Sequence, residues 1–127
     1  MIAVDTSALI AIVLREPMEA ACKAALVADP DIIVSAGTLA EALIVANGRK
    51  IANELIEFVD QLELEVVAVS QATARQVALA HARWGRGFHP AGLNFGDCFA
   101  YVAAMEHGCP LLYVGNDFSK TDVPSAL

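Results

Sequence analysis

The fold is decided at the start of the chain, where residues 2–9 have the sequence IAVDTSAL. The three apolar residues Ile2–Val4 favour a short buried strand, and this strand ends at Asp5. A helix is expected next, over residues 7–14, because the apolar residues continue there without a glycine or proline. A buried strand followed at once by a helix is typical of α/β proteins.

Short apolar runs and longer helical segments alternate along the rest of the chain. Further strands are expected at residues 32–34, 66–69 and 111–114. Helices are expected over residues 17–28, 35–48, 50–64, 70–84 and 94–108. This alternation predicts one α/β domain over residues 1–127, a sandwich in which helices flank a central, mostly parallel sheet.

Composition excludes several other classes of protein. Hydrophobic residues make up 57% of the 127 residues, which suffices for a packed core and excludes intrinsic disorder. No uncharged apolar run reaches the roughly 18 residues of a membrane span, and no signal peptide is recognisable. The three scattered cysteines, Cys22, Cys98 and Cys109, favour buried, reduced thiols. We therefore expect a cytoplasmic protein without membrane attachment.

Small residues are abundant, with 24 alanines and few large aromatic side chains. Small residues let helices pack closely, but they also leave apolar helix faces that one small domain does not cover. We therefore expect a homodimer, or a partner helix bound in a groove of this protein.

Four acidic residues stand alone in otherwise uncharged stretches, whereas the other eleven lie among polar neighbours. The four are Asp5, Glu41, Asp97 and Asp117. Three of them also have purely structural explanations: Asp5 as a helix cap, Asp97 as part of a capping box and Asp117 as a turn residue. Glu41 has none, because it lies inside an apolar helix, where an unpaired carboxylate costs several kcal/mol.

The predicted elements place all four carboxylates at one end of the sheet. Two follow strands, and two lie in helices that begin at the same end. Converging carboxylates repel one another, and a divalent cation relieves that repulsion; oxygen-only ligands suit Mg²⁺ or Mn²⁺. Such a site predicts hydrolysis of a phosphodiester. The net charge of −7 argues against a nucleic-acid partner. Without the four acids proposed as metal ligands, however, the rest of the chain carries a net charge of only −3.

Basic and aromatic residues alternate just before the third acid, in the segment RWGRGFH at residues 83–89. Arg83 and Arg86 are candidate RNA-binding residues, because single strands are held by stacking and by cations at phosphates. The alternative is a surface turn with a packed Trp84 and two solvated arginines.

Three motifs resemble the PIN-domain nucleases, and in particular the VapC-type toxins. They are IAVDTSAL at residues 2–9, AGLNFGDCFAY at residues 91–101 and LLYVGNDFSKTD at residues 111–122. The resemblance covers the whole chain, and the motifs come in the order of the family. One departure is Val114, where many relatives carry lysine or another polar residue.

The resemblance implies a PIN-like three-layer sandwich and a Mg²⁺- or Mn²⁺-dependent endoribonuclease. It also implies the toxin of a type II toxin–antitoxin pair, inhibited by a VapB-type antitoxin. Asp5, Glu41, Asp97 and Asp117 are then the metal-binding and catalytic acids, with Thr6 and Ser7 as supporting hydroxyls. Asp122 is a rival to Asp117 for the fourth place, and the proton acceptor is either Glu41 or Asp117.

Two other classes remain open. One is a receiver-like signalling module, which needs a pair of early acids, whereas Asp5 stands alone. The other is a dimeric α/β binding module without catalytic activity. Retention of all four acids disfavours it, but only product formation distinguishes an enzyme from a binding protein.

Overall fold

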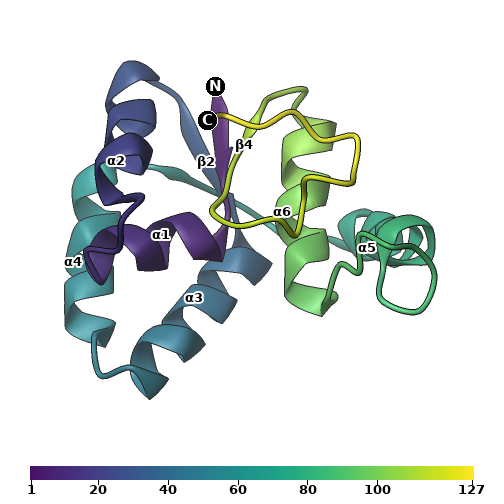
Figure 1. Ribbon diagram of the computed structural model, residues 1–127, viewed down its shortest axis with the longest axis horizontal. Helices are drawn as coiled ribbons and strands as arrows, with labels where there is room; N and C mark the ends of the chain where they lie inside the picture. Colours follow the sequence, from purple (N-terminus) through teal and green to yellow (C-terminus); the bar gives the residue numbers. More distant parts are fainter.

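The computed structural model describes residues 1–127 and contains four strands and six helices (Figure 1). In chain order these are β1 (Ile2–Val4), α1 (Thr6–Val13), α2 (Glu19–Ala28), β2 (Ile32–Ser35), α3 (Ala36–Gly48), α4 (Ala52–Leu62), β3 (Glu65–Val67), α5 (Gln71–Trp84), α6 (Phe95–Glu106) and β4 (Leu111–Leu112). The alternation of strands and helices predicted from the sequence is confirmed.

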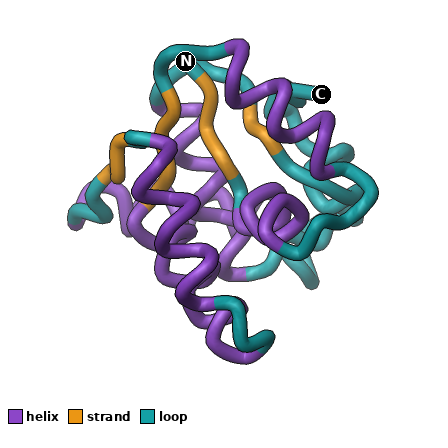
Figure 2. The backbone as a smooth tube through the Cα atoms, turned by 90° about the vertical axis from the view of Figure 1, so that its left-hand side faces the viewer, coloured by secondary structure: helices purple, strands orange, loops and turns teal.

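The strands form one sheet in the order β3-β2-β1-β4, and every neighbouring pair is parallel. The strands lie side by side in Figure 2, with helices around them. The central strand, β1, pairs on one side with β2 and on the other with β4, so that Ala3 lies opposite both Ile33 and Leu111. Because parallel strands end at the same edge of a sheet, Asp5 and the beginning of α3 come to one edge.

The core lies in two layers, one on each face of the sheet. Ile2 and Val4 pack against α1 to α4, whereas Ala3, between them, packs against α5 and α6. This alternation follows from the two-residue period of a strand, which sends successive side chains to opposite faces. In Figure 1, α1 to α4 lie to the left of the strands and α6 to the right, with α5 outermost. The expected three-layer sandwich is therefore confirmed.

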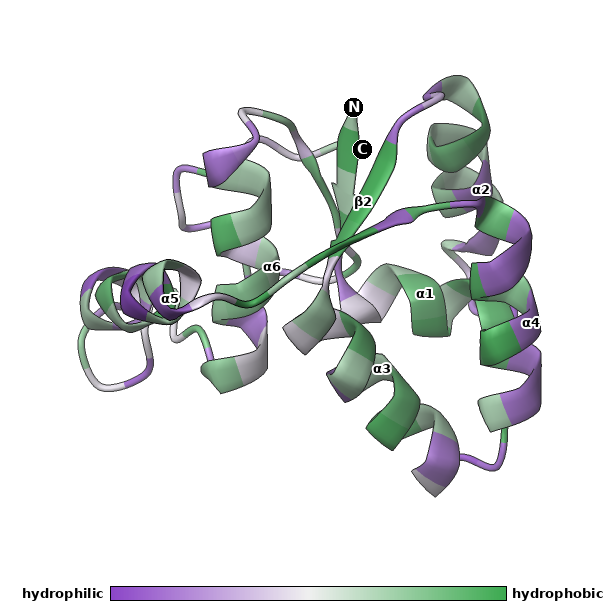
Figure 3. Ribbon diagram, turned by 180° about the vertical axis from the view of Figure 1, so that it is seen from behind, coloured by the Kyte–Doolittle hydropathy of each residue, from purple (hydrophilic) through white to green (hydrophobic).

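Helix α4 illustrates how an amphipathic sequence is used. Its Leu55 is fully buried in the core, while Phe58 and Val59 pack against the same cluster. In Figure 3 the polar side of α4 faces outward, away from α1. The apolar face predicted for this segment is thus the face that packs against α1 and α3.

Several element boundaries differ from the sequence prediction. The strand predicted at 66–69 lies at 65–67, because its only partner, β2, ends at Ser35. The strand predicted at 111–114 ends at Leu112, because β1 offers no partner beyond Val4. The helix predicted from Pro17 begins at Glu19, and the helix predicted from residue 50 begins at Ala52, after Lys50 adopts a positive φ of 59°.

The C-terminal segment protects the outer edge of β4, since the main chain of Leu111 pairs with Pro124 and Ala126. The three cysteines are free and buried, as expected. No helix of this chain combines the length and the apolarity that crossing a membrane requires.

Candidate active site

Asp5 is the most confined acid of the molecule. It is the N-cap of α1, and its Oδ2 atom accepts hydrogen bonds from the amide and the hydroxyl of Ser7, at 3.0 and 2.6 Å. The residue is only 3% exposed, and its Oδ1 atom is buried without any hydrogen-bond partner. Burial raises the pKa of Asp5, although the hydrogen bonds from Ser7 oppose this shift. Both the capping role and an unused carboxylate oxygen are therefore present in one residue.

Ser7 connects this acid to the far end of the chain. Its hydroxyl donates to Asp5 and accepts the amide of Val114 at 3.0 Å, a contact between residues 107 positions apart. The segment that follows β4 is thereby held beside the end of β1. Ser7 is one of the two predicted supporting hydroxyls, and the acid that it contacts is Asp5.

Glu41 is half-buried on α3 and is held by two contacts. Its Oε1 atom accepts a hydrogen bond of 2.6 Å from the Thr6 hydroxyl, and its carboxylate packs directly on Gly96. A Cβ atom at Gly96 would collide with that carboxylate, so the first turn of α6 needs glycine there. These contacts bring Glu41 from α3 to the start of α6, next to Asp97.

Asp97 stands in the first turn of α6 and takes part in a capping box. Asn94 accepts the amide of Asp97 at 2.8 Å, and the Oδ2 atom of Asp97 accepts the amide of Asn94 at 3.0 Å. Burial raises the pKa of Asp97 to about 6, and the negative charges of Asp5, Asp117 and Glu41 act in the same direction. The structural explanation is correct for Asp97, yet all three other acids also act on it electrostatically.

Asp117 lies at the exposed rim, in the turn that follows β4. It forms no ion pair and no side-chain hydrogen bond within the chain, and its charge acts on Asp97. The rival residue, Asp122, is engaged elsewhere: it accepts the Tyr101 hydroxyl at 2.6 Å and pairs with Arg83 at 3.5 Å. This difference favours Asp117 as the fourth acid.

The site has oxygen donors suited to a hard divalent cation, but it is not drawn together around one. No three Asp, Glu, His or Cys side chains are grouped closely enough to hold an ion. The donor set nevertheless fits Mg²⁺ or Mn²⁺, because the Oδ1 atom of Asp5 is buried and unpaired where neighbouring carboxylates repel one another. A bound cation would supply the partner that this oxygen lacks.

Two residues of the site escaped the sequence analysis. Gly96 is one, since only the packing of α3 on α6 reveals what its missing side chain admits. The other is Thr38, which is fully buried one turn before Glu41 and whose hydroxyl has no partner. Neither has a local signal, because both depend on a neighbour that is distant in the sequence.

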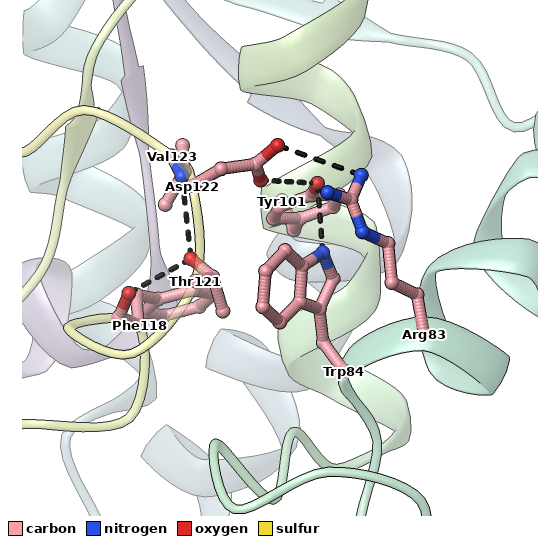
Figure 4. A network of polar contacts seen from close by, with 7 residues as sticks. All are labelled: Arg83, Trp84, Tyr101, Phe118, Thr121, Asp122 and Val123. Atoms are coloured by element: carbon pink, nitrogen blue, oxygen red, sulfur yellow. Dashed lines mark hydrogen bonds and ion pairs between the residues drawn. The ribbon is translucent and has the colours of Figure 1, made fainter.

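Figure 4 shows the contacts of Arg83, one of the two candidate RNA-binding arginines. Arg83 lies over the ring of Trp84, at 4.5 Å from its centroid, and pairs with Asp122. Trp84 in turn donates to the hydroxyl of Tyr101 at 2.9 Å. Arg86 is exposed and has no ion pair. Trp84 is therefore packed, as the alternative held, whereas Phe88 is 69% exposed and Arg86 is free to bind an anion.

Known proteins that are similar in sequence identify the family of this chain. The family model described as "PIN domain" matches residues 2–124. The chain belongs to the PIN-domain family. Among curated relatives, the ribonuclease VapC28 of Mycobacterium tuberculosis is 43% identical over 129 residues, which cover 98% of this chain and 96% of the relative. PIN-domain proteins named VapC ribonucleases are thus its relatives over nearly the whole length.

Solved structures of low sequence identity share the fold. The crystal structure of M. tuberculosis VapC20, a sarcin–ricin loop cleaving toxin, aligns with a TM-score of 0.79 at 19% identity, covering 97% of this chain and 96% of that one. The complex VapBC2 of Rickettsia felis, bound to a DNA fragment from its promoter, aligns with a TM-score of 0.75 at 14% identity. That alignment covers 98% of this chain and 96% of the matched chain. The PIN-like fold predicted from the sequence is confirmed.

Proposed function

We propose that this PIN-domain protein is a Mg²⁺- or Mn²⁺-dependent endoribonuclease and the toxin of a type II toxin–antitoxin pair. One observation carries the proposal: the buried, unpaired Oδ1 atom of Asp5 at a sheet edge where three further carboxylates act on one another. A structural acid has its oxygens paired, whereas an acid that binds a cation keeps one available. The relatives named VapC ribonucleases support the same activity.

Asp5, Glu41, Asp97 and Asp117 are the residues that would hold the ion. A bound Mg²⁺ supplies a water of lowered pKa and neutralises charge on a phosphodiester. Thr6 fixes the orientation of Glu41, and Ser7 fixes that of Asp5. Glu41 or Asp117 accepts the proton of the attacking water, and Asp117 is the more exposed of the two.

The partners of the proposed toxin are RNA, a VapB-type antitoxin and a second copy of the chain. A VapBC complex among the structural neighbours supports an antitoxin partner, which binds as a separate chain. The proposal assigns contacts with RNA to Arg83 and Arg86, of which Arg86 is unpaired in the free protein. The proposed location is the cytoplasm, because such a toxin meets its RNA substrate there.

The test is cleavage of a total-RNA pool by the purified protein, with Mg²⁺, with EDTA and with the Asp97→Asn variant. Discrete fragments are expected only from the wild-type protein with Mg²⁺, and mapping their ends identifies the target. The matched control is Asp60→Asn, since Asp60 is an exposed acid on α4. Fragments that persist in EDTA, or in Asp97→Asn, contradict the assigned site. A protein that binds Mg²⁺ and RNA without any cleavage is a binding module instead.

A further inference from the structure

Beside the carboxylates, on the side of α6 that faces α5, lies an open apolar hollow of about 390 Å³. Its lining consists of Ala74, Val77, Ala78, His81, Phe95 and Cys98. The volume falls within the range of small-ligand pockets. None of the four acids lines it, so the proposed hydrolysis does not account for it.

Phe95 forms an exposed but firmly supported wall of this hollow. Its side chain is 74% exposed, although it is the first residue of a helix whose other face is in the core. The ring meets Phe99 edge to face, with centroids 4.9 Å apart, and Phe99 packs closely on Gly37. Such support holds an exposed ring at low entropic cost, which is the arrangement that a stacking surface needs.

Charge identifies the class of ligand. From Val66 to Gly96 the chain carries no aspartate or glutamate, but it carries Arg75, Arg83 and Arg86. In a protein with a net charge of −7, this segment is therefore positively charged, and it includes α5, which supplies Ala74, Val77, Ala78 and His81 to the lining of the hollow. A flat apolar group attached to a polyanion matches both features.

We propose that the hollow between α5 and α6 is a nucleobase subsite, in which one base of a single-stranded RNA stacks on Phe95. This inference rests on the proposed ribonuclease function, and it adds the substrate contact that selects unpaired RNA. Phe95 and Asp97 both lie in the first turn of α6, so the proposed subsite and the acids share this end of the helix. Arg75 and Arg86, both exposed and without ion pairs, accompany the sugar–phosphate backbone.

The experiment measures binding by fluorescence anisotropy, in EDTA so that no cleavage occurs. The probes are a fluorescein-labelled, mixed-sequence single-stranded RNA and an abasic strand of the same length. Phe95→Ala should raise the Kd for the intact RNA roughly tenfold and leave the Kd for the abasic strand unchanged. Phe95→Tyr should restore binding, because the tyrosine ring stacks equally well.

Two further variants separate the subsite from a loss of folding. Ala78→Leu fills the hollow without altering Phe95, and it should weaken binding of the intact RNA to a similar degree. Leu79→Ala is the matched control, since Leu79 is 62% exposed on the same helix but lines a different depression. This control should change the Kd less than twofold.

The outcomes distinguish failure of the subsite from failure of the proposed function. If Phe95→Ala binds the intact RNA as tightly as the wild-type protein does, or if the wild-type protein binds neither probe, the subsite is overturned. Cleavage of total RNA in Mg²⁺ decides the proposed function separately. If Phe95→Ala weakens both probes equally and also changes the mass measured by light scattering, the hollow is an interface between two copies of the chain.

Discussion

Two acidic residues of this protein each accept a hydrogen bond from a hydroxyl group, yet they differ in how their oxygens are used. Asp122 has both oxygens engaged, one by the Tyr101 hydroxyl and one by Arg83 (Figure 4). The Oδ2 atom of Asp5 accepts two hydrogen bonds from Ser7, whereas its Oδ1 atom is buried without a partner. A residue whose bonding capacity is satisfied stabilises the fold, whereas a buried, unsatisfied carboxylate calls for a further ligand.

The same contrast extends to the charges around each acid. Asp122 pairs with the guanidinium group of Arg83, whereas burial, together with the charges of neighbouring carboxylates, raises the pKa values of Asp5 and Asp97. One region, the clamp of Arg83, Trp84, Tyr101 and Asp122, is thus complete within the chain. Under the proposed function the other is completed by a cation, and this difference leads to the following predictions.

The largest effect is expected from exchanging each acid for its amide. Asp5→Asn should abolish RNA cleavage in Mg²⁺ while the protein stays folded, because the amide still caps α1 but binds a cation poorly. Asp122→Asn should retain cleavage and lose at most about 1 kcal/mol of stability, as is usual for an exposed ion pair. Cleavage assays and thermal melts check both, and an inactive Asp122→Asn would remove the distinction between the two regions.

The next largest effect concerns the support of Glu41. Thr6→Val keeps the shape of a nearly buried side chain but removes the hydroxyl that donates to Glu41. Residues that orient a metal ligand typically contribute about 10- to 100-fold, so the initial rate of cleavage should fall by that factor. Thr73→Val is the control, since the Thr73 hydroxyl bonds only to Ser70 at the start of α5. An unchanged rate in Thr6→Val means that Glu41 is held by Gly96 alone.

The clamp can be tested through stability. Tyr101→Phe removes a hydroxyl that donates to Asp122 and accepts from Trp84, in a residue only 7% exposed. Its loss should lower the free energy of unfolding by about 1–2 kcal/mol, measured by chemical denaturation. Tyr113→Phe is a suitable control, because the Tyr113 hydroxyl has no hydrogen bond within the chain. Equal stabilities of the two variants contradict a structural role for the clamp.

A smaller effect should appear in the pH dependence of the cation-free protein. The pKa of Asp97 is raised to about 6, above the ordinary value of 3.8, so the folded state binds this proton more tightly than the unfolded chain does. Its contribution to stability is therefore full below about pH 4 and is lost as the pH rises through 6. In EDTA the melting temperature should be higher at pH 5 than at pH 7.

The Asp97→Asn variant sharpens this test, because it has no proton to lose. Its melting temperature should vary less between pH 5 and pH 7 than that of the wild-type protein. Asp29 does not interfere in this range, since a hydrogen bond from the Asp31 amide and the N-terminal amine hold its pKa below the ordinary value. A wild-type melting temperature that is flat over the interval refutes the assigned cause.

The smallest effect should separate the two arginines. Arg86→Ala should reduce the slope of log K for RNA against log salt by about 1, as the loss of one phosphate contact does. Arg83→Ala should change that slope less, because Arg83 is already paired with Asp122. Binding titrations at several salt concentrations measure both slopes. If the two variants have equal slopes, both arginines make the same kind of contact with RNA.

Local sequence determined much of this protein. The order of strands and helices, the parallel sheet and the isolation of Asp5, Glu41, Asp97 and Asp117 follow from apolar periodicity and from charge placed against it. These features were predictable because the apolar side chains that become buried recur at different spacings in strands and in helices. An isolated charge in an apolar stretch is likewise visible without knowing the fold.

Tertiary structure alone decided which oxygens are paired. The bond from Val114 to Ser7, the fit of Glu41 on Gly96 and the engagement of Asp122 by Tyr101 join residues that are distant in the chain. Such contacts depend on side-chain directions at the crossings of elements, which no local pattern encodes. For the same reason the sequence left Asp122 as a rival to Asp117, whereas the packing of α6 against the C-terminal segment engages Asp122 with Tyr101 and Arg83.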